Sequence, residues 1–392
     1  MEILKAFKFR IYPTEDQRKE LAIQFGHARF VYNAALELRK DIFFGTGESL
    51  NYNDCAGILT EAKDNPDLAW LKQANAQVLQ QSLKDLDKAF QNFFRNKANG
   101  TLPPPRKIPR KDGMPNGYPT LRRKTDKQSI RFPQDCKLQG QRVYLPKVGW
   151  IKIRLHQQIE GQLRSITVSK TKTGKFFASI LCEFDKPEPV QKDGVVGIDL
   201  GLKDFVTLAT DEGTIKVEAP KFLRKSERAL KIRQRRLSRK LEAKKHRHSW
   251  HDKDKGDRTI DKARLIVAAT HEKITNRRKD FHHQLSRQII NGFGVIGLET
   301  LNVKGMVKNH NLAKSIADAG WAQFVSFVEY KAKWAGAEIV KHDRWFASSK
   351  TCHDCGYVNR GLQLSDRVWT CPGCGVIHDR DENAAKNLIP FG

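Results

Sequence analysis

Hydrophobic and polar positions in the first half of the chain switch between a period of two and a helical period. Residues 3–11 alternate, which predicts a strand, and helical spacing follows over about 14–43 and again over 78–94. A linker rich in Pro, Gly, Lys and Arg covers 101–120. Alternation returns over about 128–185, which predicts a barrel or a sandwich. We therefore expect the first strand to join the later strands in one sheet, with the helical block inserted.

A second arrangement begins at residue 194, with a buried strand that ends in a carboxylate. Two more strands follow with a turn at 211–213, then a long basic helical stretch over 222–290, and then a strand, a helix and a strand. Apolar residues recur every seven positions in the basic stretch, which predicts two helices joined by a turn near Gly256 and Asp257. This order of elements is that of an α/β, RNase H-like fold.

Charge narrows the class of function. The 392 residues include 71 Lys and Arg against 44 Asp and Glu, which gives a net charge of +27 spread over most of the chain. Such a balance indicates a long polyanion bound along a channel, and the alternative is a basic soluble protein without that partner. Residues 224–239 carry mostly positive charge. A solvated helix face is the ordinary interpretation of such a run, and we favour contact with a nucleic-acid backbone.

Cysteine usage and hydropathy bear on the compartment. Four of the seven cysteines belong to the metal motif described next, and the odd remainder argues against a disulfide framework. No apolar stretch approaches membrane-spanning length, and the chain opens on a strand-like run in place of a secretory signal. We therefore expect a cytoplasmic bacterial or archaeal protein associated with the nucleoid.

Four cysteines near the C-terminus form the most specific single motif. TCHDCG and WTCPGCG each hold a pair spaced by two residues, with fifteen residues between the pairs. Four thiolates close the coordination sphere of one tetrahedral Zn²⁺, so this metal would be structural and not catalytic. We expect the neighbouring His353 and His378 to lie outside the ligand set. The predicted ligands are Cys352, Cys355, Cys371 and Cys374.

Three carboxylates stand where an RNase H-like order would bring them together. Asp199 ends the first strand of that order, Glu299 ends the fourth, and Asp381 opens the last helix. Each alone could be a turn or a helix cap, and Asp204 and Asp379 compete for the first and third places. Because clustered carboxylates repel one another as bare anions, they would hold two divalent ions, Mg²⁺ or Mn²⁺. Such ions clamp the attacking water and the leaving oxygen of a phosphodiester.

These motifs together resemble the TnpB proteins of bacterial insertion sequences, small RNA-guided nucleases related to the type V CRISPR effectors. The similarity covers nearly the whole chain, and the Asp-Glu-Asp set and the four cysteines stand where the family has them. The segments that carry the resemblance are FGHARFVYNAAL, VLQQSLKDLDKAFQNFF, GIDLGLKDF, NRRKDFHHQLS, GLETLNVKGM, and SSKTCHDCG through HDRDENAAKNL.

The resemblance implies an α/β multidomain architecture. A wedge β-barrel would comprise 1–12 and 118–190, and a helical recognition lobe with the proline-rich linker would comprise 13–117. A RuvC-like, RNase H-like nuclease domain would comprise 191–392, with the basic helical pair and an inserted zinc ribbon at 348–377.

The resemblance also implies the partners. A guide RNA from the right end of the transposable element would direct a monomeric ribonucleoprotein to double-stranded target DNA beside a short motif. Tyr52, Gln80 and Gln134 match positions that contact that motif, whereas Ala76 replaces a lysine of some relatives. Contacts to the nucleic-acid backbone are expected at Arg233, Arg235, Arg236, Arg239, Arg277, Arg278 and Arg367.

Three functions remain open from the sequence. The first is an RNA-guided DNA endonuclease. The second is a transposase that joins DNA ends through an acidic triad on the same fold, and it would need a strand-transfer step that nothing in the sequence indicates. The third is a nuclease-inactive zinc protein that binds DNA as a regulator, against which the intact carboxylates argue.

Overall fold

The chain divides into two compact units, Met1–Lys186 and Pro187–Gly392, each described by itself. Part of the proline-rich segment and the predicted turn at Gly256 fall outside the described residues. The computed structural model describes residues 2–103, 113–185, 189, 192–246, 257–363 and 365–390.

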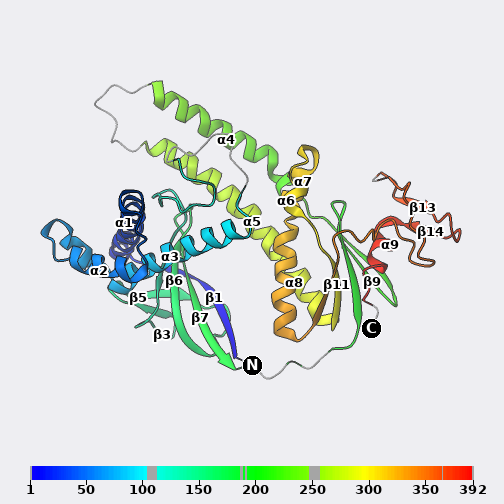
Figure 1. The fold of residues 1–392 in the computed structure, drawn as a ribbon, viewed down its shortest axis with the longest axis horizontal. Helices are drawn as coiled ribbons and strands as arrows, with labels where there is room; N and C mark the ends of the chain where they lie inside the picture. Colours follow the sequence, from blue (N-terminus) through cyan, green and yellow to red (C-terminus); the bar gives the residue numbers. More distant parts are fainter. Residues whose placement is uncertain are drawn as a thin grey trace. The chain divides into compact units, whose positions relative to one another are not determined.

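The first unit contains an antiparallel sheet (Figure 1). In its described part the strands follow the order β2-β6-β7-β1-β5-β4-β3. β1 pairs with β7 and with β5, which confirms that the first strand joins strands more than 130 residues later. The hydrogen-bonded order runs from β2 to β3 without closing, so a barrel stays a prediction. The strands are β1 Glu2–Tyr12, β2 Gln128–Phe132, β3 Lys137–Gln139, β4 Arg142–Leu145, β5 Gly149–Arg154, β6 Gln162–Lys170 and β7 Phe176–Asp185.

The helices of the first unit fall between β1 and β2. A capping box begins α1: the Thr14 hydroxyl accepts from the Gln17 N–H, and the Gln17 side chain accepts from the Thr14 N–H. Leu21 and Phe25 pack against the sheet, whereas the apolar stripe of α3 forms a second core with α1 and α2. The bounds are α1 Glu15–Thr46, α2 Tyr52–Ala62, the 3₁₀ helix η1 Pro66–Gln73 and α3 Ala76–Ala98.

The second unit is built on a mixed sheet with the order β10-β9-β8-β11-β12. The first three strands along the chain form the predicted antiparallel meander, and β11 and β12 extend the sheet in parallel with β8. This arrangement confirms the α/β class. The strands are β8 Val195–Leu200, β9 Asp204–Thr210, β10 Gly213–Glu218, β11 Val295–Glu299 and β12 Glu338–His342.

Helices and a small hairpin complete the second unit. α4 and α5 run side by side, and α5 also packs on α8 and contributes Leu285 and Ile289 to the core of the sheet (Figure 1). α8 ends before Gly336, which is its C-cap in the left-handed conformation. The remaining bounds are α4 Phe222–His246, α5 Arg258–Gly292, α6 Val303–Met306, α7 His310–Ala319, α8 Trp321–Ala335, β13 Val368–Thr370, β14 Ile377–Asp379 and α9 Arg380–Lys386.

The helices of the described residues differ from membrane-spanning helices in length and hydropathy. None of them combines the length and the apolar character that a bilayer span requires.

Candidate active site and metal centre

Two of the predicted carboxylates lie at the same edge of the mixed sheet. β8 and β11 are parallel neighbours, and Ile198 stands opposite Leu298 at the end of their pairing. The next residues along the two strands are Asp199 and Glu299. The carboxyl ends of parallel strands meet at one sheet edge, which is where open α/β sheets bind ligands.

Two glycines allow the last helix and the turn after it to lie directly on these strands. Gly197 and Gly297 stand opposite each other on β8 and β11. A Cβ on Gly197 would overlap the carbonyl oxygen of Ala385, and one on Gly297 would overlap that of Leu388. Any larger side chain at either position would therefore displace the segment that carries Asp381.

The start of α9 separates the two candidates for the third carboxylate. Asp379 is the N-cap, and its side chain accepts from the N–H groups of Asp381 and Glu382 at 3.0 and 3.1 Å. Asp379 also pairs with Lys216 of β10 at 2.8 Å. Asp379 therefore caps the helix. Asp381 does not cap it, and its charge acts on Asp199.

Burial and neighbouring charges act on the carboxylates of β8 and β11. Burial, together with the charges of Glu299 and Asp381, raises the pKa of Asp199 to about 8, against a smaller opposing effect of Arg380. Burial also raises the pKa of Glu299 to about 7. Arg367 lies 3.4 Å from Asp381 but is more than half exposed. The chain itself therefore compensates little of the negative charge at this edge.

This donor set fits hard divalent cations, which prefer carboxylate oxygens. The oxygen atoms of the three carboxylates do not all lie within 4.8 Å of one another. Among the described residues, the clusters of possible metal ligands that are this compact all contain cysteine. A single ion chelated by all three would need that closer spacing. That the site holds a pair of ions stays a prediction.

Removing one charge from this site should stabilise the metal-free protein. Because the pKa of Asp199 is raised in the folded state, ionisation costs stability progressively as pH rises from about 4 toward 8. We expect Asp199→Asn to raise the free energy of unfolding at pH 8 by on the order of a few kcal/mol, and by less at pH 5. Thermal melts in buffer without divalent metal measure this difference, and added Mg²⁺ should stabilise the wild type more than the variant.

Asp379→Asn is the matched control, and we expect it to change the stability at pH 8 in the opposite direction. Burial alone would raise the pKa of Asp379, but Lys216 and the first N–H groups of α9 outweigh it and lower that pKa. Its ionised form therefore contributes stability above the unfolded pKa, and Asp379→Asn should lower the melting temperature at pH 8. If Asp199→Asn melted at a lower temperature than the wild type at pH 8 without metal, the ionised Asp199 carboxylate would not be destabilising the folded protein, and the prediction would be wrong.

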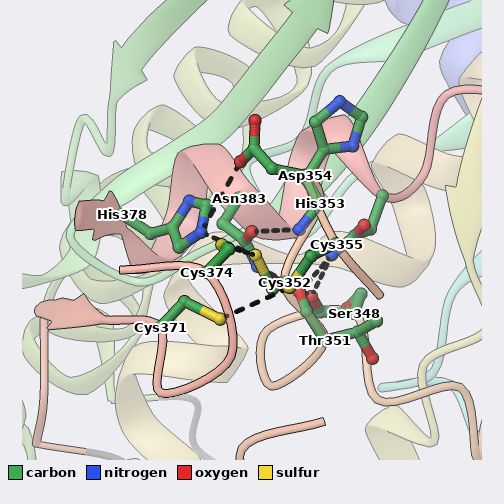
Figure 2. Close-up of polar contacts among 11 residues, drawn as sticks. Ser348, Thr351, Cys352, His353, Asp354, Cys355, Cys371, Cys374, His378 and Asn383 are labelled. Atoms are coloured by element: carbon green, nitrogen blue, oxygen red, sulfur yellow. Dashed lines mark hydrogen bonds and ion pairs between the residues drawn. The ribbon is translucent and has the colours of Figure 1, made fainter. Parts of the chain in front are cut away.

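The four predicted zinc ligands converge (Figure 2). The Cys352 and Cys374 sulfurs lie 3.7 Å apart, and those of Cys355 and Cys371 lie 3.6 Å apart. A tetrahedron of Zn–S bonds of about 2.3 Å separates its sulfurs by about 3.8 Å, whereas a disulfide would bring them to about 2 Å. The Cys₄ cluster therefore has the geometry that a zinc site requires.

His378 belongs to this centre without joining the four thiolates. Its Nε2 lies 3.0 Å from the Cys352 sulfur and 3.6 Å from Asp354, and its ring packs against Trp369. A buried imidazole N–H directed at a thiolate would hold that ligand in orientation. His378 stands directly before Asp379 on β14, so the zinc centre and the start of α9 are adjacent in the chain.

Two amides also tie the zinc segment to α9. The Asn383 side chain accepts from the His353 N–H at 2.9 Å and donates to the Thr351 carbonyl at 2.7 Å. Asn387, one turn later, donates to the Ser348 carbonyl at 2.8 Å. The first cysteine pair is thus bonded to the helix that bears Asp381.

Comparison with known proteins places these sites in a family. A protein of Streptomyces pristinaespiralis named "Putative RNA-guided DNA endonuclease" is 36% identical over 396 residues, covering 100% of this chain and 90% of that protein. The chain belongs to the TnpB family. "Putative RNA-guided DNA endonuclease InsQ" of Escherichia coli (strain K12) is 29% identical, over 100% of this chain and 93% of that one.

Three family models match successive parts of this TnpB-family chain. "Helix-turn-helix domain" matches residues 1–44, "Probable transposase" matches 179–310 and "Cas12f1-like, TNB domain" matches 321–388. Residues 1–44 do not form a helix-turn-helix, since α1 is one unbroken helix after a strand. Among solved structures, a Cas12f1-sgRNA-target DNA complex aligns over 98% of both chains at 19% identity, with a TM-score of 0.35.

The residues predicted to read the target-adjacent motif all lie in the first unit. Gln80 is exposed on α3, and Gln134 is exposed and accepts from Gln77, one helical turn before Gln80, at 2.8 Å. Tyr52 opens α2, with the Lys84 ammonium 5.3 Å from its ring centre. Their contact with DNA stays a prediction.

Two of the predicted backbone-binding arginines make contacts within the second unit. Arg233 donates to the Thr270 hydroxyl and so joins α4 to α5. Arg278 donates to the Ala317 carbonyl at 2.8 Å. Their contacts with nucleic acid, like those of the others, stay predictions. The exposed members of the set are Arg233, Arg235, Arg236, Arg239, Arg277 and Arg367, and Arg278 is partly buried.

The sequence reasoning did not assign several residues that build the site. Gly197 and Gly297 stand beside the predicted carboxylates, and a glycine two residues before each of them is the signal that could have drawn attention to close packing. Lys216 bridges Asp379 and Glu382 at 2.8 and 2.9 Å from a strand more than 160 residues earlier. No local pattern marks Lys216 for that role.

Proposed function

We propose that the chain is an RNA-guided DNA endonuclease. One observation carries the proposal: the charges of Glu299 and Asp381 act on Asp199 at the carboxyl edge of a sheet whose strands follow the order third, second, first, fourth, fifth. An antiparallel meander extended by two parallel strands is the order we expect of an RNase H-like, RuvC-type domain. The relatives named as RNA-guided DNA endonucleases, similar over the whole chain, support the same reading.

The three carboxylates would hold Mg²⁺ or Mn²⁺, which would lower the pKa of a bound water and stabilise the charge that develops on the scissile phosphate. Asp199 and Glu299 are fixed by two paired strands, and Asp381 by the first turn of α9. Arg367 approaches from outside and could leave Asp381 when metal binds, since it is mostly exposed. Burial of Asp199 and Glu299 keeps this edge poorly solvated, which strengthens each electrostatic interaction there.

The guide and the target would be held mainly through charge. Lys and Arg exceed Asp and Glu by 27, and α4 presents exposed arginines that position a phosphate backbone without reading its sequence. We propose that the first unit comprises the wedge and recognition lobe, with Tyr52, Gln80 and Gln134 near the target-adjacent motif. The RNA would come from the right end of the element, and sequence would be read by base pairing.

Co-expression with the DNA that follows the gene tests this function. The protein should be purified with its RNA, the RNA sequenced, and the complex given plasmids that carry the matching target beside a randomised motif. We expect Mg²⁺-dependent linearisation of matching plasmids and none after ribonuclease treatment. Target-directed cutting after removal of all RNA, or joining of 3′ ends to plasmid, would overturn the proposal in favour of a transposase. Binding without cutting would favour the regulator.

A further inference from the structure

A cavity beside the candidate active site is not explained by the carboxylates. It has a volume of about 230 Å³, and its lining includes Glu299, the segment 300–302 after β11 and the segment 342–346 after β12. β11 and β12 are parallel neighbours, with Glu299 opposite His342. The cavity therefore opens at the same edge of the sheet as the carboxylates.

The segment after β12 is held in place by several bonds. The Thr300 hydroxyl donates to the His342 carbonyl at 2.7 Å. The Asp343 side chain accepts from the Trp345 N–H at 2.7 Å, and its carbonyl accepts from the Phe346 N–H at 3.0 Å. The Phe346 ring stacks on His342 with centroids 5.4 Å apart. The backbone that carries Trp345 is therefore well anchored.

Trp345 itself is presented to solvent. It is 78% exposed, more than any other large hydrophobic residue in the described part of the chain. The Arg344 guanidinium lies over its ring, 4.3 Å from the centroid. An anchored turn that exposes an indole with an arginine beside it has the chemistry of a platform for nucleobases, because each base offers a face for stacking and each phosphate a charge for arginine.

We propose that Trp345 stacks on a nucleobase of the single strand whose backbone enters the carboxylate site, with Arg344 on an adjacent phosphate. The inference rests on the proposed function, and it assigns to that site a residue that holds the base next to the scissile phosphate. Base pairing would bury the base faces within a duplex, so an exposed indole beside Glu299 can act only on an unstacked nucleotide. DNA and RNA single strands share this chemistry.

Binding of short oligonucleotides tests the proposal without cleavage. The ribonucleoprotein is titrated, in buffer without divalent metal, with labelled oligothymidine and with an abasic oligonucleotide of the same length. We expect Trp345→Ala to weaken oligothymidine binding by about 5- to 150-fold and to leave abasic binding unchanged. Trp345→Phe should retain most of the affinity. An oligouridine arm shows whether the site prefers DNA or RNA.

Trp150→Ala is the matched control, because Trp150 is the other exposed tryptophan named among the described residues, at 38%, and belongs to the first unit. It should not change either affinity. Zinc content and melting temperature of Trp345→Ala should match the wild type, since the removed side chain is solvated. Equal loss for both oligonucleotides, or no loss for either, would overturn the stacking role. Because no cutting is measured, failure of the nuclease proposal would appear separately, in the plasmid assay.

Discussion

Asp381→Asn should abolish cleavage, whereas Asp379→Asn should leave it largely intact. Both changes remove one negative charge at the start of α9. Asn is as good an N-cap as Asp, so Asp379→Asn keeps the helix start and loses mainly the ion pair with Lys216. Asp381 caps nothing in that way and interacts with Asp199. Only its replacement should remove a ligand of the metal ions.

The expected loss is large. Removing a residue that merely orients a metal ligand costs about 10–100-fold in metal affinity or activity, so losing a ligand should cost on the order of 10³-fold or more. Asp199→Asn and Glu299→Gln should behave like Asp381→Asn. Rates of guide-directed plasmid cleavage measure the effect, and RNA content of the purified complexes should stay unchanged. A dead Asp379→Asn beside an active Asp381→Asn would reverse the assignment of the third carboxylate.

The elements of this chain were predictable where local pattern and packing agree. Short sequence signals determine two helix ends. Thr14 and Gln17 form the capping box at the start of α1, and Gly336 follows the last residue of α8. The pairing of β1 with β7 was expected because alternation marks one buried face on each strand. These predictions depend on short-range signals that the tertiary structure reinforces.

The details of the site depend on contacts between distant residues. The sequence alone could not choose between Asp379 and Asp381, because they are two residues apart and only the cap geometry distinguishes them. Lys216 and Gly297 gain their roles from α9 and from Leu388, which lie far along the chain. For Trp345 the sequence is misleading, because hydrophobicity alone would place a tryptophan in a core, whereas the structure exposes it.

Loss of the zinc should disable the active site from a distance. The zinc segment has a very small core, formed by Cys352, Leu362, Trp369 and Cys371, and two of these four residues are predicted zinc ligands. Without metal, little apolar burial remains to order the segment, and the binding free energy of structural zinc, about 10–16 kcal/mol in small zinc domains, is then lost from folding. Asn383 and Asn387 would lose the ordered carbonyls to which they bond. The start of α9, which carries Asp381, would then lose its hydrogen bonds to the zinc segment.

We therefore expect Cys371→Ala to reduce the zinc content from one ion per chain to none and to lower cleavage by about 100-fold or more, the cost of displacing a reacting group by about 1 Å. Elemental analysis and plasmid cleavage measure the two effects. Cys136→Ala is the matched control: Cys136 is a partly buried free thiol of the first unit, and its loss should change neither. Asn383→Ala separates the two steps, because it leaves all four thiolates in place. It should retain zinc and still lose cleavage, if the amide bridge carries the effect from the metal to Asp381. Full activity in a zinc-free Cys371→Ala protein would show that α9 holds Asp381 through its packing on Gly197 and Gly297 alone.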